Sequence, residues 1–201
     1  MGFFYNRIPK AANSTVICNL AVLRDKAIVA SRIAKTTFRT PSSLTRNDMP
    51  SFERCFKFTV VRNPYTRILS AYLDKIVREK KSATGIRKNQ DGKTTFADFC
   101  DYLNAGGLYK NAHWAPQISL LLLPKERFDF IGKVETLQKD MRHIWQRLAP
   151  DSVNPAFQTT APHRTDAKTR VTEYLSRHCR KMISSLYKQD FEEFGYNPDA
   201  I

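Results

Sequence analysis

The sequence contains little glycine and no long hydrophobic run. Its 201 residues include only 7 glycines, which excludes a collagen-like chain and a flexible glycine-rich chain. No stretch approaches the roughly 18 apolar residues that a membrane-spanning helix requires, and the first residues, MGFFYNR, lack the apolar core of a secretory signal. These absences predict a chain without an integral membrane segment, and the length suits a single domain over residues 1–201.

The four cysteines form no metal-binding pattern. Cys18, Cys55, Cys100 and Cys179 lie far apart and include no CxxC pair, so we expect no zinc site. No cluster of carboxylates suggests magnesium either, and we therefore expect no metal. Because each cysteine lies in an apolar stretch, we expect all four to be reduced residues of the core.

Acidic residues are outnumbered by basic ones. The chain has 19 Asp and Glu against 33 Lys and Arg, a net charge of +14. Such an excess favours an anionic partner, although a solvated basic surface would have the same composition. The basic residues are spread along the chain, with no basic tail and no recognised nucleic-acid motif, so we expect no nucleic-acid partner.

The order of apolar segments predicts an α/β fold. Strands are expected at 3–5, 56–61 and 128–134, and helices from about residue 14, over 64–76, 95–103 and 137–148, with one long terminal helix over 171–187. The polar segment 35–51 is expected to be a long connection with little regular structure. This alternation favours a mostly parallel central sheet flanked by helices, whose ligands bind at the carboxyl ends of the strands.

The segment after the first expected strand, IPKAANST at residues 8–15, has the features of an anion-binding loop. A helix N-terminus offers unpaired N–H groups and a partial positive charge, to which Lys10 adds a full charge and Ser14 and Thr15 add hydroxyls. The loop is not of the Walker A type, because the glycine pattern is absent and Lys10 precedes the hydroxyls by four residues. An ordinary capped helix after a buried strand is the alternative.

A second candidate for anion binding follows the next expected strand. Arg62 ends that strand and Ser70 lies two turns into the following helix, and a guanidinium with a hydroxyl suits a phosphate. Arg62 could instead be a structural partner for a carboxylate. Arg67 is expected to be a solvated helix residue. Two anion sites at adjacent strand ends suggest a ligand with two separated anionic groups.

Five blocks of the sequence follow one another in a recognisable order. They are IPKAANST at 8–15, FTVVRNPYTRILSAYLDK at 58–75, HWAPQISLL at 113–121, FDFIGKVETLQKD at 128–140 and LYKQDFEEFGY at 186–196. They are distributed from residue 8 to residue 196. In these blocks the sequence resembles the sulfotransferases that use 3′-phosphoadenosine-5′-phosphosulfate, and most closely the carbohydrate sulfotransferases of the chondroitin 4-O/HNK-1 type and their bacterial relatives.

This resemblance implies a P-loop-like architecture and a role for each matching position. The 5′-phosphosulfate loop would consist of Lys10, Ala11, Ala12, Asn13, Ser14 and Thr15. Lys10 would also act in catalysis by stabilising the leaving phosphate. The 3′-phosphate would be bound by Arg62 and Ser70, and a basic loop before the terminal helix would cover the nucleotide through Arg164, Thr165 and Lys168. The family needs no metal.

The catalytic base has several candidates. Related sulfotransferases usually supply a His or Glu from between the two phosphate motifs, but this chain has no His between Thr15 and Arg62. His113, in a matching block, is our first candidate, although it could be a packing residue. The alternatives are His163, Asp48 and Glu53. The two helical histidines, at positions 143 and 178, are expected on the surface.

The resemblance implies a saccharide acceptor, and either Trp114 or Tyr109 could stack on a sugar ring. It does not name the sugar or the hydroxyl. Two other functions stay open: a P-loop-like nucleotide kinase, and a catalytically silent, polyanion-binding member of the fold. We expect a bacterial-type cytoplasmic protein, with a Golgi-lumenal domain trimmed of its anchor as the alternative.

Overall fold

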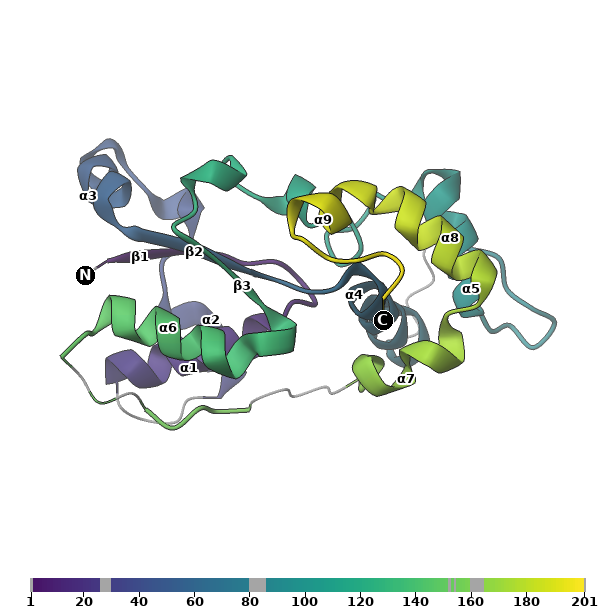
Figure 1. Cartoon of the computed structure of the whole chain (residues 1–201), viewed down its shortest axis with the longest axis horizontal. Helices are drawn as coiled ribbons and strands as arrows, with labels where there is room; N and C mark the ends of the chain where they lie inside the picture. Colours follow the sequence, from purple (N-terminus) through teal and green to yellow (C-terminus); the bar gives the residue numbers. More distant parts are fainter. Residues whose placement is uncertain are drawn as a thin grey trace. The chain divides into compact units, whose positions relative to one another are not determined.

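The structure, a computed structural model, describes residues 2–25, 30–79, 86–151, 153, 155–159 and 165–200. The chain packs as two compact units (Figure 1). The first comprises Met1–Val61 and Leu122–Pro162, and the second comprises Arg62–Leu121 and His163–Ile201. A single domain over residues 1–201 stays a prediction.

A parallel three-stranded sheet forms the centre of the first unit. Its strands are β1 (Phe3–Asn6), β2 (Phe56–Val61) and β3 (Phe130–Lys133), in the order β1-β2-β3. Phe3 pairs with Phe56, and Phe58 pairs with Phe130. Every residue of β2 is buried, as expected of a central parallel strand whose sequence is almost continuously apolar. The predicted α/β fold with a parallel sheet is confirmed.

Helices cover the sheet of the first unit. They are α1 (Asn13–Asp25), α2 (Ser31–Thr37), α3 (Met49–Arg54) and α6 (Leu137–Leu148). Figure 1 shows α1, α2 and α6 on one side of the sheet. There Ile17 and Trp145 pack in one apolar cluster with Phe58 of the sheet. On the opposite face, Phe4 of β1 meets Phe52 of α3 with ring centroids 5.3 Å apart.

The segment 35–51 has more regular structure than the sequence predicts. It contains the end of α2, 3₁₀ turns at Pro41–Ser43 and Arg46–Asp48, and the start of α3. Local hydrogen bonds explain the second turn, because the Asp48 carboxylate accepts from both the N–H and the hydroxyl of Thr45, each at 2.8 Å. Such a capping box stabilises a helical turn without help from an apolar pattern.

The second unit is helical. Its helices are α4 (Pro64–Ala71), which continues as a π-helical stretch over Tyr72–Arg78, α5 (Phe96–Tyr102), which leads into Leu103–Gly107, and α7 (Ala167–Tyr174), α8 (Arg177–Leu186) and α9 (Lys188–Glu193). Its core contains Leu69, Phe99 and Ile183. Further 3₁₀ turns lie at Ile118–Leu120 in this unit, and at Lys125–Arg127 and Val134–Thr136 in the first unit.

The long terminal helix predicted over 171–187 is wrong. Leu175 leaves the helical conformation after α7, with φ −86° and ψ 74°, and the Ser176 side chain accepts the backbone N–H of Cys179. This hydrogen bond caps the N-terminus of α8. The prediction followed the apolar spacing and overlooked the serine, which is the residue that starts a new helix.

The cysteines are all free, but they are not all in the core. Cys18, Cys100 and Cys179 are buried as predicted. Cys55, just before β2, is only half-buried, so the prediction was wrong there. Among the described residues, no helix is long and apolar enough to cross a membrane.

Candidate active site

The loop between β1 and α1 has a strained backbone. Lys10 and Ala12 have φ angles of +66° and +55°, a region that residues with a Cβ atom rarely adopt. The Ala11 N–H donates to the Ile8 carbonyl at 3.3 Å, and the Val16 N–H donates to the Ala12 carbonyl at 3.0 Å. Left-handed residues in such loops turn successive N–H groups toward one point, which suits an anion. Strain of this kind is typical of a functional segment.

Apolar residues anchor this loop and leave its polar groups at the surface. Ile8 and Ala11 are fully buried, whereas Lys10, Asn13 and Ser14 are partly exposed. The Oδ1 atom of Asn13 is itself buried and has no hydrogen-bond partner among the described residues. A buried acceptor without a donor costs free energy.

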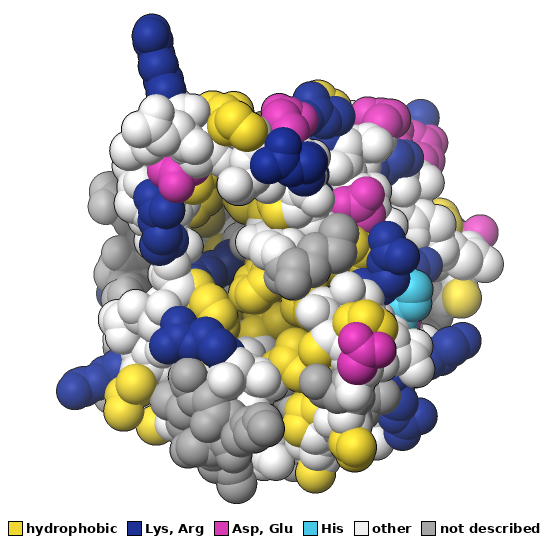
Figure 2. All heavy atoms as spheres, turned by 90° about the vertical axis from the view of Figure 1, so that its left-hand side faces the viewer, with side chains coloured by type: hydrophobic (Ala, Val, Ile, Leu, Met, Phe, Trp, Pro, Cys, Tyr) yellow, Lys and Arg dark blue, Asp and Glu magenta, His cyan; other side chains and the backbone are white. Residues whose placement is uncertain are grey.

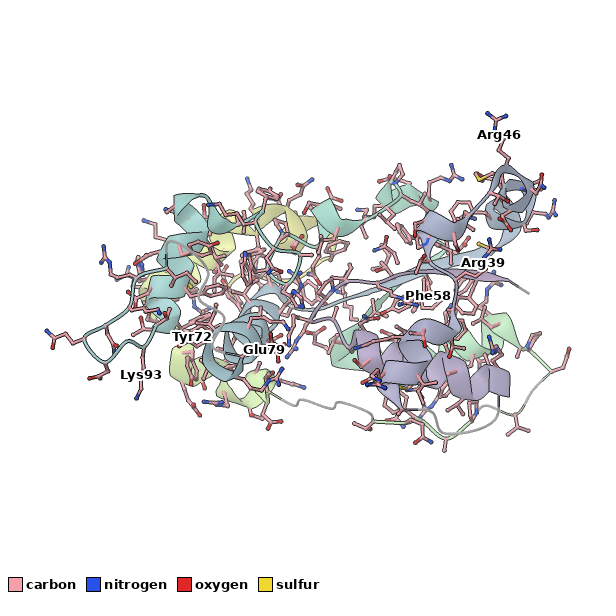
Figure 3. All side chains as sticks on the ribbon, turned by 180° about the vertical axis from the view of Figure 1, so that it is seen from behind. Arg39, Arg46, Phe58, Tyr72, Glu79 and Lys93 are labelled. Carbon is pink, nitrogen blue, oxygen red and sulfur yellow. The ribbon has the colours of Figure 1, made fainter. Side chains whose placement is uncertain are left out.

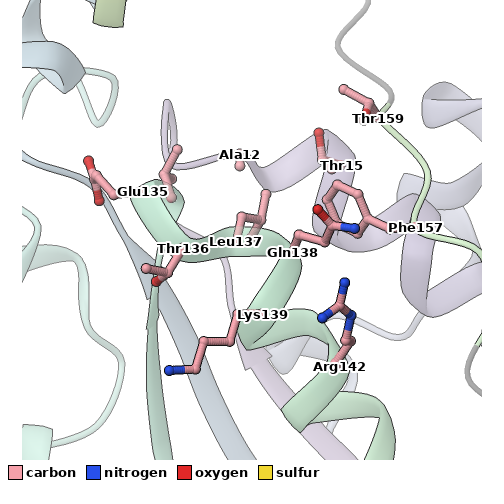
Figure 4. Close-up of a pocket in the computed structure, with 11 residues that line it drawn as sticks. Ala12, Thr15, Glu135, Thr136, Leu137, Gln138, Lys139, Arg142, Phe157 and Thr159 are labelled. Carbon is pink, nitrogen blue, oxygen red and sulfur yellow. The ribbon is translucent and has the colours of Figure 1, made fainter.

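A pocket of about 530 Å³ lies beside the loop. It is lined by Ala12 and Thr15 of the loop, by Val134, Glu135, Thr136, Leu137, Gln138, Lys139 and Arg142 around the start of α6, and by Phe157 and Thr159. In Figure 4, Gln138 and Arg142 lie on the side of Thr15 and Phe157, whereas Glu135 and Lys139 point the other way. The pocket therefore combines the start of α1, an aromatic ring and a guanidinium.

Two polar residues, one of them fully buried, hold the walls of this pocket. Asn19 of α1 is fully buried, and its amide donates to the carbonyls of Thr15 and Gln158 at 2.8 Å and accepts the Gln158 N–H at 2.9 Å. Asp140 accepts the Lys133 N–H and the Thr136 hydroxyl, both at 2.7 Å. Asn19 thus fixes the segment that carries Phe157, and Asp140 fixes the turn before α6.

Arg62 lies at the start of the second unit and is held at its backbone. Its N–H donates to the Gln117 Oε1 at 2.9 Å, and its carbonyl accepts from the Gln117 Nε2 at 2.8 Å. The guanidinium Nε donates to the Thr66 hydroxyl at 3.0 Å. Both the main chain and the side chain of Arg62 are therefore oriented by their neighbours.

Gln117 is in turn held by a buried carboxylate. Asp190 of α9 is fully buried and accepts the N–H groups of Gln117 and Ile118 at 2.8 and 2.9 Å. Burial raises the pKa of Asp190, and the hydrogen bonds from Gln117 and Ile118 oppose that rise. A chain of contacts therefore leads from Asp190 through Gln117 to Arg62.

Ser70 meets the segment that precedes α7. Its hydroxyl lies 3.0 Å from the Thr165 hydroxyl, so two of the predicted donor contacts, Ser70 and Thr165, come together in the second unit. Lys168 is exposed on α7. Arg164, the third residue predicted in that loop, lies outside the described residues.

Arg67 is not the solvated residue that the sequence predicts. It is fully buried, and its guanidinium donates to the carbonyls of Ala115 and Ala112 at 2.8 and 3.2 Å. Burial lowers the pKa of Arg67. This residue ties α4 to the segment that carries His113, and the apolar spacing of the helix gave no signal of that role.

His113 is half-buried and oriented by Asn111. The Asn111 Oδ1 accepts the His113 backbone N–H at 2.9 Å and lies 2.8 Å from the ring Nδ1. Because this oxygen can only accept, Nδ1 carries the proton and Nε2 is the basic nitrogen of the neutral ring. The two histidines on helices, His143 and His178, are exposed, as predicted.

The alternative bases have structural partners or lie outside the described residues. Asp48 pairs with Arg39 at 2.8 Å, and the hydrogen bonds from Arg39 and Thr45 lower the pKa of Asp48 well below its usual range. Glu53 pairs with Arg127 on the surface. A carboxylate with a strongly lowered pKa is a poor base at neutral pH, which counts against Asp48. His163 is not among the described residues.

Trp114 cannot offer the sugar-stacking face that the sequence suggests. Its ring is buried against Phe99 and Tyr102, with 4% exposure, and its Nε1 donates to the Gly107 carbonyl at 2.9 Å. Tyr109, by contrast, is 70% exposed and stays a candidate. Within the described part of the chain, no group of three or more His, Cys, Asp or Glu side chains could hold a metal ion.

Comparison with known proteins identifies the family. Residues 1–197 match the family model described as "Sulfotransferase family". Carbohydrate sulfotransferase 14 of Danio rerio is 30% identical over 96% of this chain and 59% of its own length. Carbohydrate sulfotransferase 11 of Rattus norvegicus is 30% identical over 70% of this chain and 47% of its own length, and carbohydrate sulfotransferase 10 of Rattus norvegicus is 30% identical over 73% and 48%. The chain thus spans about half the length of the curated relatives it matches. No solved structure matches it significantly. This chain belongs to the sulfotransferase family.

Proposed function

We propose that this chain transfers a sulfuryl group from 3′-phosphoadenosine-5′-phosphosulfate to a hydroxyl of a carbohydrate acceptor. The observation that carries the proposal is the strained loop at 8–15, in which Lys10 and Ala12 are left-handed at the start of α1, in a chain of the sulfotransferase family. The names of the relatives, all carbohydrate sulfotransferases, support the acceptor class.

In this proposal the donor's contacts are the residues predicted from the sequence. The 5′-phosphosulfate binds to Lys10–Thr15, where N–H groups, hydroxyls and a positive charge are available. The neighbouring pocket takes part of the nucleotide, and Arg142 adds a cation there. The 3′-phosphate binds to Arg62 and Ser70. We keep Arg164 as a covering residue on the strength of the family resemblance alone.

Sulfuryl transfer by in-line displacement requires positioning and charge stabilisation, as phosphoryl transfer does. Lys10 stabilises the charge that develops on the leaving phosphate. His113 removes the proton of the acceptor hydroxyl through Nε2, while Asn111 holds the proton on Nδ1 and orients the ring. The donor is a co-substrate, and this scheme uses no metal.

Donor preference separates this function from a nucleotide kinase. We expect adenosine 3′,5′-bisphosphate to raise the melting temperature far more than ATP with magnesium, because a ligand stabilises the state that it binds. Lys10→Ala and Arg62→Ala should each reduce this shift, whereas Lys93→Ala, on an exposed loop (Figure 3), should not. A larger shift with ATP and magnesium would refute the proposal in favour of the kinase.

Transfer itself separates an enzyme from a silent, polyanion-binding member of the family. We expect label from a ³⁵S-donor to appear in at least one glycan of a panel of chondroitin, dermatan and terminal glucuronyl acceptors. His113→Asn should lower turnover at least about tenfold, since general-base catalysis typically contributes more than that, and should leave bisphosphate binding unchanged. Bisphosphate binding without transfer to any glycan would favour the silent member. An unchanged rate in His113→Asn would remove His113 as the base.

The cellular location stays a proposal as well. The comparisons name animal enzymes and give no support to the cytoplasmic location expected from the sequence. A lumenal domain is the alternative, and fractionation of the natural source would distinguish the two.

A further inference from the structure

A second cavity in the first unit shares no lining residue with the pocket beside the loop. Its volume is about 690 Å³, within the range of small-molecule sites. The lining comes from β1, α1, the segment 37–44, α3 and their neighbours, and comprises Gly2, Phe3, Phe4, Tyr5, Arg7, Ile17, Leu20, Arg24, Thr37, Phe38, Arg39, Thr40, Pro41, Leu44, Asp48, Ser51, Phe52, Cys55 and Leu122. On the face shown in Figure 2, hydrophobic side chains line a hollow, and Lys and Arg side chains lie around it.

Aromatic rings form part of the apolar wall of this cavity. Phe3 meets Phe38 edge-on with ring centroids 5.4 Å apart, and Phe4 meets Phe52 in the same manner at 5.3 Å. Such edge-to-face pairs fix the rings relative to one another. The wall is therefore formed before any ligand binds, and it suits an aromatic or acyl group.

The lining of the cavity also includes polar and positively charged side chains. Arg7, directly after β1, donates to the Lys35 carbonyl at 3.3 Å and forms no ion pair with a described carboxylate. Arg39 differs, because Asp48 neutralises it. Tyr5 is only 9% exposed, and its hydroxyl is buried with no hydrogen-bond partner among the described residues. Burial raises the pKa of Tyr5, and the nearby charge of Arg7 opposes the rise.

The backbone of β1 adds further polar groups along the same cavity. The Phe56 N–H donates to the Gly2 carbonyl, and peptide groups alternate in direction along a parallel strand. The peptide groups of Phe3 and Tyr5 therefore face away from β2, and no described strand pairs with that edge of β1. Unpaired N–H groups at a strand edge can donate to a ligand.

We propose that this cavity binds an anionic amphiphile, a small molecule with an aromatic or acyl body and a carboxylate head. The body packs among Phe3, Phe38 and Phe52. The carboxylate accepts from the Tyr5 hydroxyl, which has no hydrogen-bond partner among the described residues, and pairs with Arg7, whose charge no described carboxylate balances. The site is separate from the donor pocket and does not depend on sulfotransferase activity.

Calorimetric titration of the full chain with 2-naphthoate and with uncharged 2-naphthamide tests this proposal. We expect one naphthoate to bind per chain, about tenfold more tightly than the amide, because a charge-assisted hydrogen bond is lost in the amide. Arg7→Gln should abolish this preference and Arg7→Lys should keep part of it. Arg46→Gln is the matched control and should change nothing, since Arg46 points away from the protein (Figure 3) and does not line the cavity. Phe38→Ala should weaken both probes.

Three results would overturn the proposal. Equal affinity for the two probes in the unaltered chain would show that the charge of Arg7 has no part in binding. Displacement of naphthoate by saturating adenosine 3′,5′-bisphosphate would place the probe in the donor site. A dimer that excludes naphthoate, detected by sedimentation, would show that a second copy of the chain covers the cavity. None of these results depends on whether the chain transfers sulfate.

Discussion

Replacing Gln117 with methionine should weaken 3′-phosphate binding, although Arg62, the residue proposed to bind the phosphate, is itself unchanged. Methionine has nearly the same length but cannot form the two hydrogen bonds that the Gln117 amide makes with the Arg62 N–H and carbonyl, at 2.9 and 2.8 Å. A hydrogen bond between neutral groups contributes about 1 kcal/mol net. We therefore expect the free energy of unfolding to fall by about 2 kcal/mol, and Arg62 to be less well oriented.

The effect on affinity follows from what Arg62 contributes. A hydrogen bond to a charged group is worth about 1.5–3 kcal/mol, so Arg62→Ala should weaken bisphosphate binding by about 10- to 150-fold. A misplaced Arg62 keeps its charge and loses part of its geometry, and we expect Gln117→Met to weaken binding by about tenfold. Calorimetric titration with adenosine 3′,5′-bisphosphate measures both values.

Adenosine 5′-phosphate, which lacks the 3′-phosphate, is the control ligand. Its affinity should be the same in Gln117→Met and in the unaltered chain. Gln189→Met, an exposed glutamine of α9 in the same unit, is the control variant and should change neither affinity. The double variant Arg62→Ala with Gln117→Met should bind the bisphosphate no more weakly than Arg62→Ala alone. Equal losses for the two nucleotides, or additive losses in the double variant, would refute the reasoning.

Two further predictions concern helix caps in the second unit. Ser176→Ala removes the hydroxyl that accepts the Cys179 N–H and should lower the free energy of unfolding in urea by about 1 kcal/mol. Ser185→Ala, at an exposed position near the other end of α8, should lower it much less. Equal losses would mean that Ser176 does not cap α8. Asp98 accepts the Thr95 N–H at 3.0 Å, and its hydrogen bonds with Thr95 lower the pKa of Asp98. The stabilising contribution of Asp98 is therefore present above the unfolded-state pKa and is lost as the pH falls through the lowered pKa of the folded state. Asp98→Asn should therefore reduce the loss of stability on acidification. An unchanged dependence of stability on pH in this variant would contradict the prediction.

Much of the fold could be predicted from local patterns. The apolar run FKFTVV predicts β2 with its observed bounds, and the spacing of apolar residues predicts α6. Both predictions depend only on residues close in sequence. Burial of one face of a helix or strand spaces its apolar residues periodically. The break between α7 and α8 and the turn before α3 were missed because they depend on single capping side chains, Ser176 and Asp48, which interrupt or override the apolar pattern.

The candidate site was predictable only in part. Lys10 and its loop could be found because a strand, a basic residue and hydroxyls follow one another in sequence. The positive φ angles of Lys10 and Ala12 could not be predicted from the sequence. Neither residue is a glycine, and only the surrounding packing imposes these angles. Arg142 lines the pocket from the polar face of α6. The sequence predicts that this face is polar, but it does not predict that Arg142 faces a pocket.

The residues that sequence reasoning missed share a recognisable context. Asn19 lies between Cys18 and Leu20, Gln117 lies in WAPQISLL, and Asp190 precedes Phe191; all three are polar groups beside buried apolar positions, and all are fully buried. A buried amide or carboxylate must find several partners, because an unsatisfied polar group there is costly. The partners of these three are backbone groups that carry site residues: Asn19 holds the segment of Phe157, Gln117 holds Arg62, and Asp190 holds Gln117. The blocks at 113–121 and 186–196, far apart in sequence, are thereby linked through one carboxylate to the arginine proposed to bind the donor. An isolated amide in an apolar stretch, as at Asn19 and Gln117, is therefore a sequence signal for the support of a site. Asp190 lies among the charged residues of KQDFEEF, and the sequence does not distinguish it from the neighbouring carboxylates.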